Sequence, residues 1–332
     1  MTQLLSKFAV RSALFAAVAT VAALPAMGQD SQASYVDPNY KAPKTSWGVP
    51  DFEGVYLTTT AVPMERPKEL GDKAFYTDAE VTANAQARAN RGPARVGVHY
   101  DNAQFGLSPT VTGTVPNNRT SMITSDDGRM PEMLPAAAKL QADQRADRRD
   151  HQYDGPEMRG DAERCIYWGH EGVPMRPVGY NGTLQIVQSP GYVTIRHEMI
   201  STARIIPTDN REHVDSKLRS YFGDSVGHWE GDTLVVDTTN FNDHPPLRGA
   251  DENLHVVERF TRTSPDNITY QYTVTDPTVW EKSWSAEWPM GMTEGPIYEY
   301  ACQEGNYGMA GVLSGARVTE WEAEHNNNGG QE

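Results

Sequence analysis

The chain has few cysteines, fewer basic than acidic residues, and no long apolar segment beyond its N-terminal end. Only Cys165 and Cys302 occur among 332 residues, and no CxxC pair is present, so a thiolate zinc site of the usual spacing is excluded. The 29 Lys and Arg residues are outnumbered by 44 Asp and Glu, which gives a net charge of −15 and argues against a nucleic-acid or anionic-membrane partner. The motifs HExxH, GxGxxG and the Walker loop are also missing.

The N-terminal segment has the three parts of a secretory signal peptide. Lys7 and Arg11 supply the positive start, residues 12–24 form an uncharged Ala-rich run, and residues 26–28 place small side chains before a cleavage site. A transmembrane anchor is the alternative, but it needs about 20 strongly apolar residues and this run is shorter. We therefore expect residues 1–28 to be removed on export, leaving a periplasmic or secreted protein with no integral membrane segment.

The two cysteines are expected to form a disulfide bond, because an exported chain folds in an oxidising compartment. A bond between Cys165 and Cys302 would close a loop of about 137 residues. Chain entropy alone would then stabilise the fold by up to about 4 to 5 kcal/mol. A free nucleophilic thiol or a metal ligand is the alternative for either residue.

The exported chain is predicted to contain an arm, one β-rich domain and a tail. Residues 29–50 are polar and Pro-rich and predict an extended arm. Residues 51–320 are long enough for a single domain, and the polar residues 321–332 predict a disordered tail. Two short helices are expected near the start of this domain, at about 77–91 and 135–149. The first begins with the capping box TDAE and the second with a proline.

From residue 180 onward, hydrophobic alternation and turn residues predict antiparallel strands. Turns are expected at 190–191, 230–232 and 264–267, with a further strand at 297–302 and a first strand near residue 55. The pattern shows no alternation of strands with helices, which argues against a parallel α/β fold. About six to eight short strands favour a sandwich or, as we predict, a lipocalin-like antiparallel barrel built mostly from residues 180–302 with the two helices packed outside.

Short motifs follow one another along the chain: Arg119-Thr120-Ser121, Asp127-Gly128-Arg129, Glu163-Arg164-Cys165-Ile166, the block from Gly223 to Val236, Glu258-Arg259-Phe260 and Tyr298-Glu299-Tyr300-Ala301-Cys302. With its GDSxGxWEGDTLVV block and its C-terminal YEYAC motif, the chain resembles a widespread family of exported, largely uncharacterised bacterial proteins. The resemblance covers nearly the whole exported chain. It implies export and a single domain, and it supplies no set of catalytic residues.

The segment 223–227 has the spacing of the GxSxG elbow that carries the nucleophile of serine hydrolases. That elbow requires a strand before the serine and a helix after it. Here Ser225 is followed by the turn at 230–232 and then by a strand. We therefore interpret the segment as a glycine turn at the edge of the barrel.

Glu258 is the most informative carboxylate, because alternation places it with Val256 and Phe260 on an apolar strand face. A carboxylate in such a place is unfavourable unless it is paired. One hypothesis is a buried ion pair with Arg204 or Arg259 that supports the fold. The other is a general acid or base with a raised pKa inside a cavity.

His197, Glu198 and His255 lie in or beside predicted strands and complete the candidate catalytic set with Glu258. We expect at least one of the four to face a cavity in the barrel, with late aromatic residues mostly in the core: Trp280, Trp284, Trp288, Tyr298, Tyr300 and Tyr307. This pattern predicts an enzyme that acts on a hydrophobic or aromatic small molecule by cofactor-free acid/base catalysis, as a lyase, isomerase or hydrolase. The alternative is a non-catalytic periplasmic binding or accessory protein. No cofactor is predicted, and binding of a divalent metal is left open.

Overall fold

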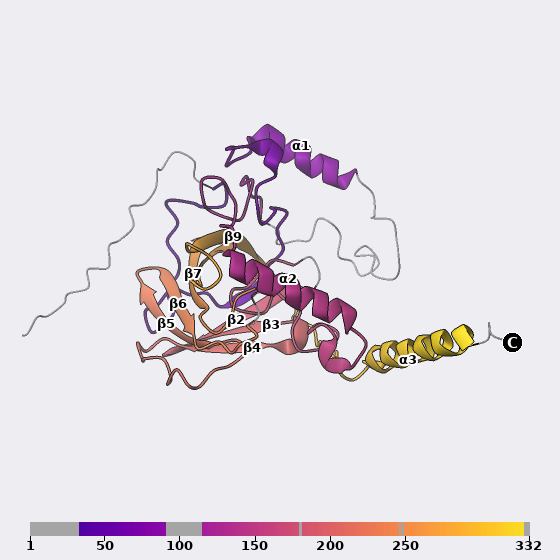
Figure 1. The fold of residues 1–332 in the computed structure, drawn as a ribbon. Coiled ribbons are helices and arrows are strands. Elements are labelled where there is room, and N and C mark those ends of the chain that lie inside the picture. The colour runs from indigo at the N-terminus through magenta and orange to yellow at the C-terminus, as the bar shows by residue number, and fades with distance from the viewer. Residues whose placement is uncertain (1–32, 91–114, 179–180, 246, 248, 329–332) are drawn as a thin grey trace, which may run out of the picture. The chain divides into compact units, whose positions relative to one another are not determined.

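The fold is dominated by one antiparallel β-sheet of nine strands (Figure 1). The structure is a computed structural model, and it describes residues 33–90, 115–178, 181–245, 247 and 249–328. The predicted signal peptide, residues 1–28, lies outside these ranges. Within them, no helix combines the length and the apolar character needed to cross a membrane. The prediction of a mainly β chain is confirmed.

The strands follow the order β4-β3-β2-β1-β9-β8-β7-β6-β5, and every neighbouring pair is antiparallel. The order contains two meanders, β2 to β4 and β5 to β9, with β1 between them. No strand pairing joins β4 to β5, so the sheet is not closed. Their bounds are β1 (Gly54–Leu57), β2 (Thr183–Ser189), β3 (Tyr192–His197), β4 (Ala203–Pro207), β5 (Asp224–Glu230), β6 (Thr233–Thr239), β7 (His255–Ser264), β8 (Asn267–Thr275) and β9 (Trp284–Thr293).

The three hairpins predicted from turn residues are confirmed. Gly191 between β2 and β3 has φ 81°, and Gly231 between β5 and β6 has φ 60°. These left-handed conformations suit glycine because it has no Cβ to clash with the neighbouring carbonyl. The hairpin of β7 and β8 turns at Pro265 and Asp266.

The last strand lies earlier in the sequence than predicted. Residues 297–302 form no strand, and the strand is instead β9, in which Trp284, Ala286 and Trp288 are buried. The alternation of apolar and polar side chains from Trp284 is the usual pattern of a half-buried strand, which the concentration of aromatic residues obscured. Outside the sheet, Tyr298 is 65 % exposed, so it is not a core residue.

Both predicted N-terminal helices are present, as α1 (Asp78–Ala89) and α2 (Pro135–Asp150). The capping box of α1 is formed: the Thr77 amide donates to Glu80 Oε2 at 2.9 Å and the Glu80 amide donates to Thr77 Oγ1 at 3.4 Å. No residue of α2 is buried, although Ala137 packs against the core. Short 3₁₀ helices occur at Lys68–Leu70, Pro156–Met158 and Met199–Ser201.

The prediction of a disordered tail is wrong for residues 321–328, which belong to α3 (Tyr307–Asn328). The polar end of the chain suggested fraying, but the preceding run contains Ala310, Leu313 and Ala316, which have high helix propensity. Its large apolar side chains are exposed, Trp321 at 59 % and Val318 at 56 %, so packing contributes little to this helix.

One face of the sheet forms the core of the protein. Aromatic side chains from neighbouring strands pack there, with the ring of Tyr270 centred 4.9 Å from Phe260 and 4.8 Å from Trp288. Burying each such side chain contributes roughly 1.5 to 3 kcal/mol. The same face also carries His197, Arg204, Glu258 and Tyr270, and these polar groups define the site described next.

Candidate functional site

A buried ion pair lies within the apolar face of the sheet. Glu258 of β7 accepts hydrogen bonds from Arg204 of β4, at 3.0 Å from Nη1 and 2.5 Å from Nη2, and from the Tyr270 hydroxyl at 2.7 Å. Arg259 points to the opposite face, because it is the next residue in the strand, and pairs with Glu230 at 2.7 Å. The ion-pair hypothesis for Glu258 is therefore confirmed, with Arg204 as its partner.

Arg204 also connects the two edges of the open sheet. Its Nη2 donates to Ser225 of β5 at 3.3 Å, and the Ser225 hydroxyl lies 2.9 Å from that of Thr238. Burial alone would lower the pKa of Arg204, but Glu258 raises it, so the guanidinium stays charged. Ser225 lies inside β5 with no helix after it, so it is not the nucleophile of a hydrolase elbow.

Two buried histidines lie near this ion pair. His197 is the last residue of β3 and His170 comes from the segment before β2; their rings are 6.2 Å apart between centroids and meet edge to face. Burial lowers the pKa of His197 to about 3, helped by His170 and Arg204, and lowers the pKa of His170 to about 4. Both imidazoles are therefore neutral at pH 7, each with one nitrogen able to accept a proton or a hydrogen bond.

Several polar atoms of this cluster have no hydrogen-bond partner among the described residues. They are His197 Nε2, both ring nitrogens of His170, and Arg204 Nε, joined by the indole nitrogen of Trp288 next to Tyr270. Leaving one buried polar group unsatisfied costs about 1 to 3 kcal/mol. Native proteins keep few such groups, and a ligand or catalytic role is one physical reason for keeping them together.

Glu198 holds two chain segments next to the histidines. Its buried carboxylate accepts a hydrogen bond from Asn181 Nδ2 at 2.6 Å and another from the Tyr298 amide at 3.2 Å. The turn that follows contains Ile200 with φ 60° and Ser201 with φ 55°. Residues other than glycine rarely adopt this left-handed backbone conformation, and such strain is concentrated at ligand-binding and active sites.

The predicted disulfide is confirmed between Cys165 and Cys302, whose Cα atoms are 5.7 Å apart. It joins the segment that carries His170 to the C-terminal segment that carries Tyr298. Directly after His170, the carboxylate of Glu171 accepts hydrogen bonds from the amides of Trp168 and His170 at 3.2 and 3.1 Å. Burial raises the pKa of Glu171. The segment next to the histidine pair is thus fixed covalently and by hydrogen bonds.

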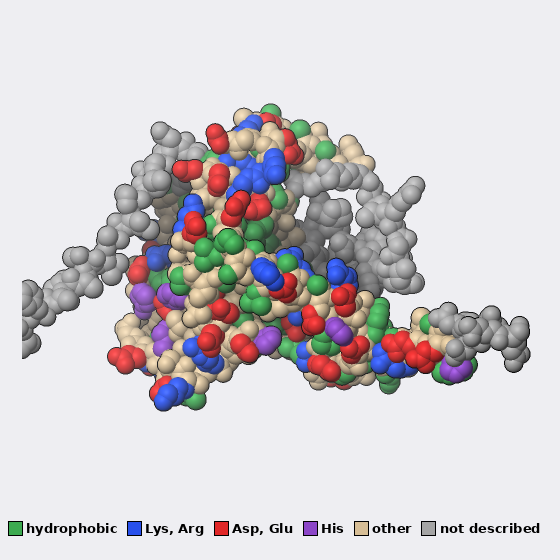
Figure 2. All heavy atoms as spheres, in the orientation of Figure 1, with side chains coloured by type: hydrophobic (Ala, Val, Ile, Leu, Met, Phe, Trp, Pro, Cys, Tyr) green, Lys and Arg blue, Asp and Glu red, His purple; other side chains and the backbone are tan. Residues whose placement is uncertain are grey.

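His255 lies apart from the other candidates. It is three residues from Glu258 and so lies on the outer face of β7, where its Nε2 is 2.8 Å from Asp237. Asp237 also contacts His213 at 3.0 Å, and His213 contacts Asp224 at 2.8 Å. Asp237 raises the pKa of His255. Figure 2 shows histidine side chains gathered on the surface where β5 and β6 lie.

The structure therefore brings His197 together with Arg204 and Glu258, places Glu198 beside them in a turn, and leaves His255 outside. No family model, curated protein or solved structure matches this chain. Across the described ranges, no group of three or more His, Cys, Asp or Glu side chains is placed to hold a metal ion.

The histidine cluster is enclosed. Two cavities elsewhere in the protein, of about 360 and 470 Å³, are lined by none of the four candidate residues. Sequence reasoning missed His170, because it lies in an irregular segment where alternation gives no information about burial. Its only sequence signal is its closeness to Cys165.

Proposed function

We propose that the protein binds a hydrophobic or aromatic small molecule with an oxygen substituent at the cluster of His170, His197 and Arg204, and moves a proton on it without a cofactor. The observation that carries this proposal is the unpartnered Nε2 of His197, which is buried beside His170, whose Nδ1 lies 3.7 Å from Glu171 Oε2 without forming a hydrogen bond. The aromatic core next to the cluster, with Tyr270 and Trp288, suits a flat apolar ligand.

In this proposal the open sheet works as a lipocalin-like barrel. The contact of Arg204 with Ser225 bridges the two edge strands, so the polar cluster occupies the interior. The disulfide fits a site of action in the periplasm or outside the cell, as the export signal predicts. A ligand reaches the histidines when the hydrogen bonds of Glu198 with Asn181 and Tyr298 break, while the disulfide stays closed.

The chemistry of the cluster divides between a base and a cation. A neutral imidazole of His197 or His170 accepts the proton that leaves the ligand. The Arg204 Nε–H donates to the ligand oxygen on which negative charge develops, while Glu258 keeps the guanidinium in position. An anionic ligand beside the imidazoles raises their pKa from the low values of the closed site, which favours the transfer.

A non-catalytic binding protein is the second candidate. The low pKa values of His197 and His170, about 3 and 4, favour it because imidazoles with these values are weak bases. In that case the histidines only accept hydrogen bonds from a ligand hydroxyl. The two candidates share the ligand class and the site, and differ in proton transfer.

Two probes separate the candidates. Naphthol tests binding, followed as quenching of the buried tryptophans such as Trp288. The nitrobenzisoxazole of the Kemp elimination tests proton transfer: its ring C–H proton passes to an imidazole, the N–O bond breaks, and a coloured cyanophenolate is released. We expect His197→Gln and His170→Gln to weaken naphthol binding and remove the elimination rate, whereas His255→Gln, the same change on the outer face, leaves both intact.

The outcomes are distinct. Binding of naphthol without elimination above the rate of free imidazole would refute the enzyme and support the binding protein. Equal naphthol affinity in wild type and in folded His197→Gln protein would refute the site for both candidates. Far-UV circular dichroism and a thermal melt of each variant show that the comparison is made between folded proteins.

A further inference from the structure

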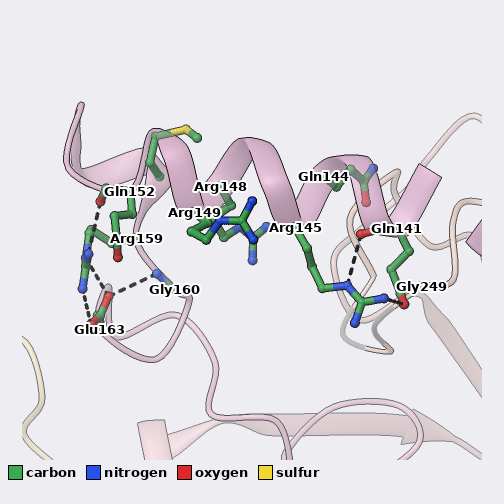
Figure 3. A pocket seen from close by; sticks show the side chains of 11 residues that line it. Gln141, Gln144, Arg145, Arg148, Arg149, Gln152, Arg159, Gly160, Glu163 and Gly249 are labelled. Carbon is green, nitrogen blue, oxygen red and sulfur yellow. Dashed lines mark hydrogen bonds and ion pairs between the residues drawn. The ribbon is translucent and has the colours of Figure 1, made fainter. Parts of the chain in front are cut away.

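A polar cavity of about 360 Å³ lies beside α2 (Figure 3). One wall is a face of α2 and the other is the segment that follows the 3₁₀ helix Pro156–Met158, with Gly249 at one end. Nothing in the proposed function uses this cavity, and it shares no residue with the histidine cluster. Its lining is polar and rich in arginine: Gln141, Gln144, Arg145, Arg148, Arg149, Gln152, Met158, Arg159, Gly160, Glu163 and Gly249.

The arginines converge because of helical spacing. Arg145, Arg148 and Arg149 are three and four residues apart and therefore lie on neighbouring positions of one helix face. Figure 3 shows them below α2, between Gln141 at one end and Arg159 at the other. This concentration of positive charge is notable in a chain whose net charge is −15.

Two of these arginines carry uncompensated charge. Arg145 donates to the carbonyl oxygen of Gln141 at 3.2 Å and to its side chain, and both acceptors are neutral. No acidic side chain in the described ranges forms an ion pair with Arg145 or Arg148, as the salt bridges of α2 involve Lys139, Arg149 and His151 instead. The pair of Arg149 with Asp150 is exposed and contributes little.

The opposite end of the cavity is neutralised. Arg159 donates to both carboxylate oxygens of Glu163, at 2.8 and 2.6 Å, and the Gly160 amide donates to the same carboxylate at 3.3 Å. The hydrogen bonds from Arg159 lower the pKa of Glu163, so this carboxylate is ionised at neutral pH. An anion is therefore attracted to the end with Arg145 and Arg148, because the paired charges of Arg159 and Glu163 cancel at the other end.

We propose that this cavity binds a small organic phosphate or sulfate monoester, with the oxyanion at Arg145 and Arg148. Guanidinium groups match the oxygens of phosphate and sulfate with parallel hydrogen bonds. The volume is that of a small-molecule site, larger than a bare anion needs. The amide side chains of Gln141, Gln144 and Gln152 supply donors and acceptors for the hydroxyl groups of the organic part.

Isothermal titration of the purified full chain with glucose phosphate, inorganic phosphate and glucose at one ionic strength tests the proposal. We expect glucose phosphate to bind at least about tenfold more tightly than phosphate, and glucose not to bind. Arg145→Gln and Arg148→Gln should each weaken the ester about tenfold or more. The matched control is Lys139→Gln, which removes the same charge from the same helix outside the cavity.

A gain of affinity gives an independent check. Glu163→Gln leaves the charge of Arg159 without its acidic partner, so it should tighten binding of the ester. Because no residue of α2 is buried, the arginine variants should melt like wild type. The proposal is overturned if glucose phosphate does not bind, if phosphate binds as tightly as the ester, or if Lys139→Gln weakens binding as much as Arg148→Gln does.

Discussion

The histidine pair should make the folded protein sensitive to mild acid. In the unfolded chain each histidine titrates near its ordinary pKa of about 6.5. In the folded protein burial lowers the pKa of His197 to about 3 and that of His170 to about 4. Below about pH 6.5 the unfolded chain therefore binds protons that the folded protein does not, and the free energy of unfolding falls as the pH falls.

The size of this effect follows from the two pKa values. Each histidine lowers the free energy of unfolding by about 1.4 kcal/mol per pH unit, or about 2 kcal/mol between pH 6.5 and pH 5. Other groups act in the opposite sense, His255 above about pH 6.5 and Glu171 above about pH 4.5. Asp237 raises the pKa of His255, and burial raises that of Glu171, so protonation of either group favours the folded state as the pH falls.

A variant isolates the contribution of one histidine. His197→Gln keeps a polar side chain of similar size and does not titrate. Urea unfolding of wild type and variant at pH 7.5 and pH 5 should show that the variant loses about 2 kcal/mol less stability over this interval. Identical losses in the two proteins, with equal dependence on urea, would show that His197 is not held neutral by burial and would refute the reasoning.

Three further predictions concern stability. Glu258→Gln should destabilise the fold by about 3 to 5 kcal/mol in thermal melts, because it leaves Arg204 buried without a counter-charge. The control Glu230→Gln, at the exposed pair with Arg259, should change stability by less than about 1 kcal/mol. Replacing Cys302 by serine should reduce the free energy of unfolding in urea by about 2 to 4 kcal/mol; a variant as stable as the oxidised wild type would contradict the role of the bond. Thr77→Ala should destabilise the start of α1 by about 1 kcal/mol, seen as faster hydrogen exchange of the Val81 amide without a change in the global melt.

Local patterns in the sequence were enough to predict the hairpins and the environment of Glu258. Alternation along β7 placed Glu258 among apolar residues and also shows why Arg259, one residue later, cannot reach it. The choice of Arg204 required the sheet order, because β4 and β7 lie at separate places in the sheet and their side chains meet only across its face. Such pairing between distant segments leaves no local signature.

The rest of the site was hidden for the same reason. His170 and the segment around Glu171 have no regular secondary structure, so no periodicity indicates which side chains are buried. In the sequence His255 looked equivalent to His197, because each lies in a predicted strand close to a glutamate. Which face of a strand is buried, however, depends on how the whole sheet packs. The cavity beside α2 could not be predicted either, because its second wall is an irregular segment that folds back beside the helix.

The position of β1 has a consequence for the order in which the chain folds. Residues 54–57 pair with 183–186 on one side and with 291–293 on the other, whereas the strands within each meander pair with their sequence neighbours. The two meanders can form rapidly from local hairpins, but joining them through β1 requires the closure of long loops, which is entropically unfavourable and slow. β1 is the first strand in the sequence, but it pairs with its neighbours late in folding. A substitution of Tyr56 in β1 should therefore slow folding less than it accelerates unfolding.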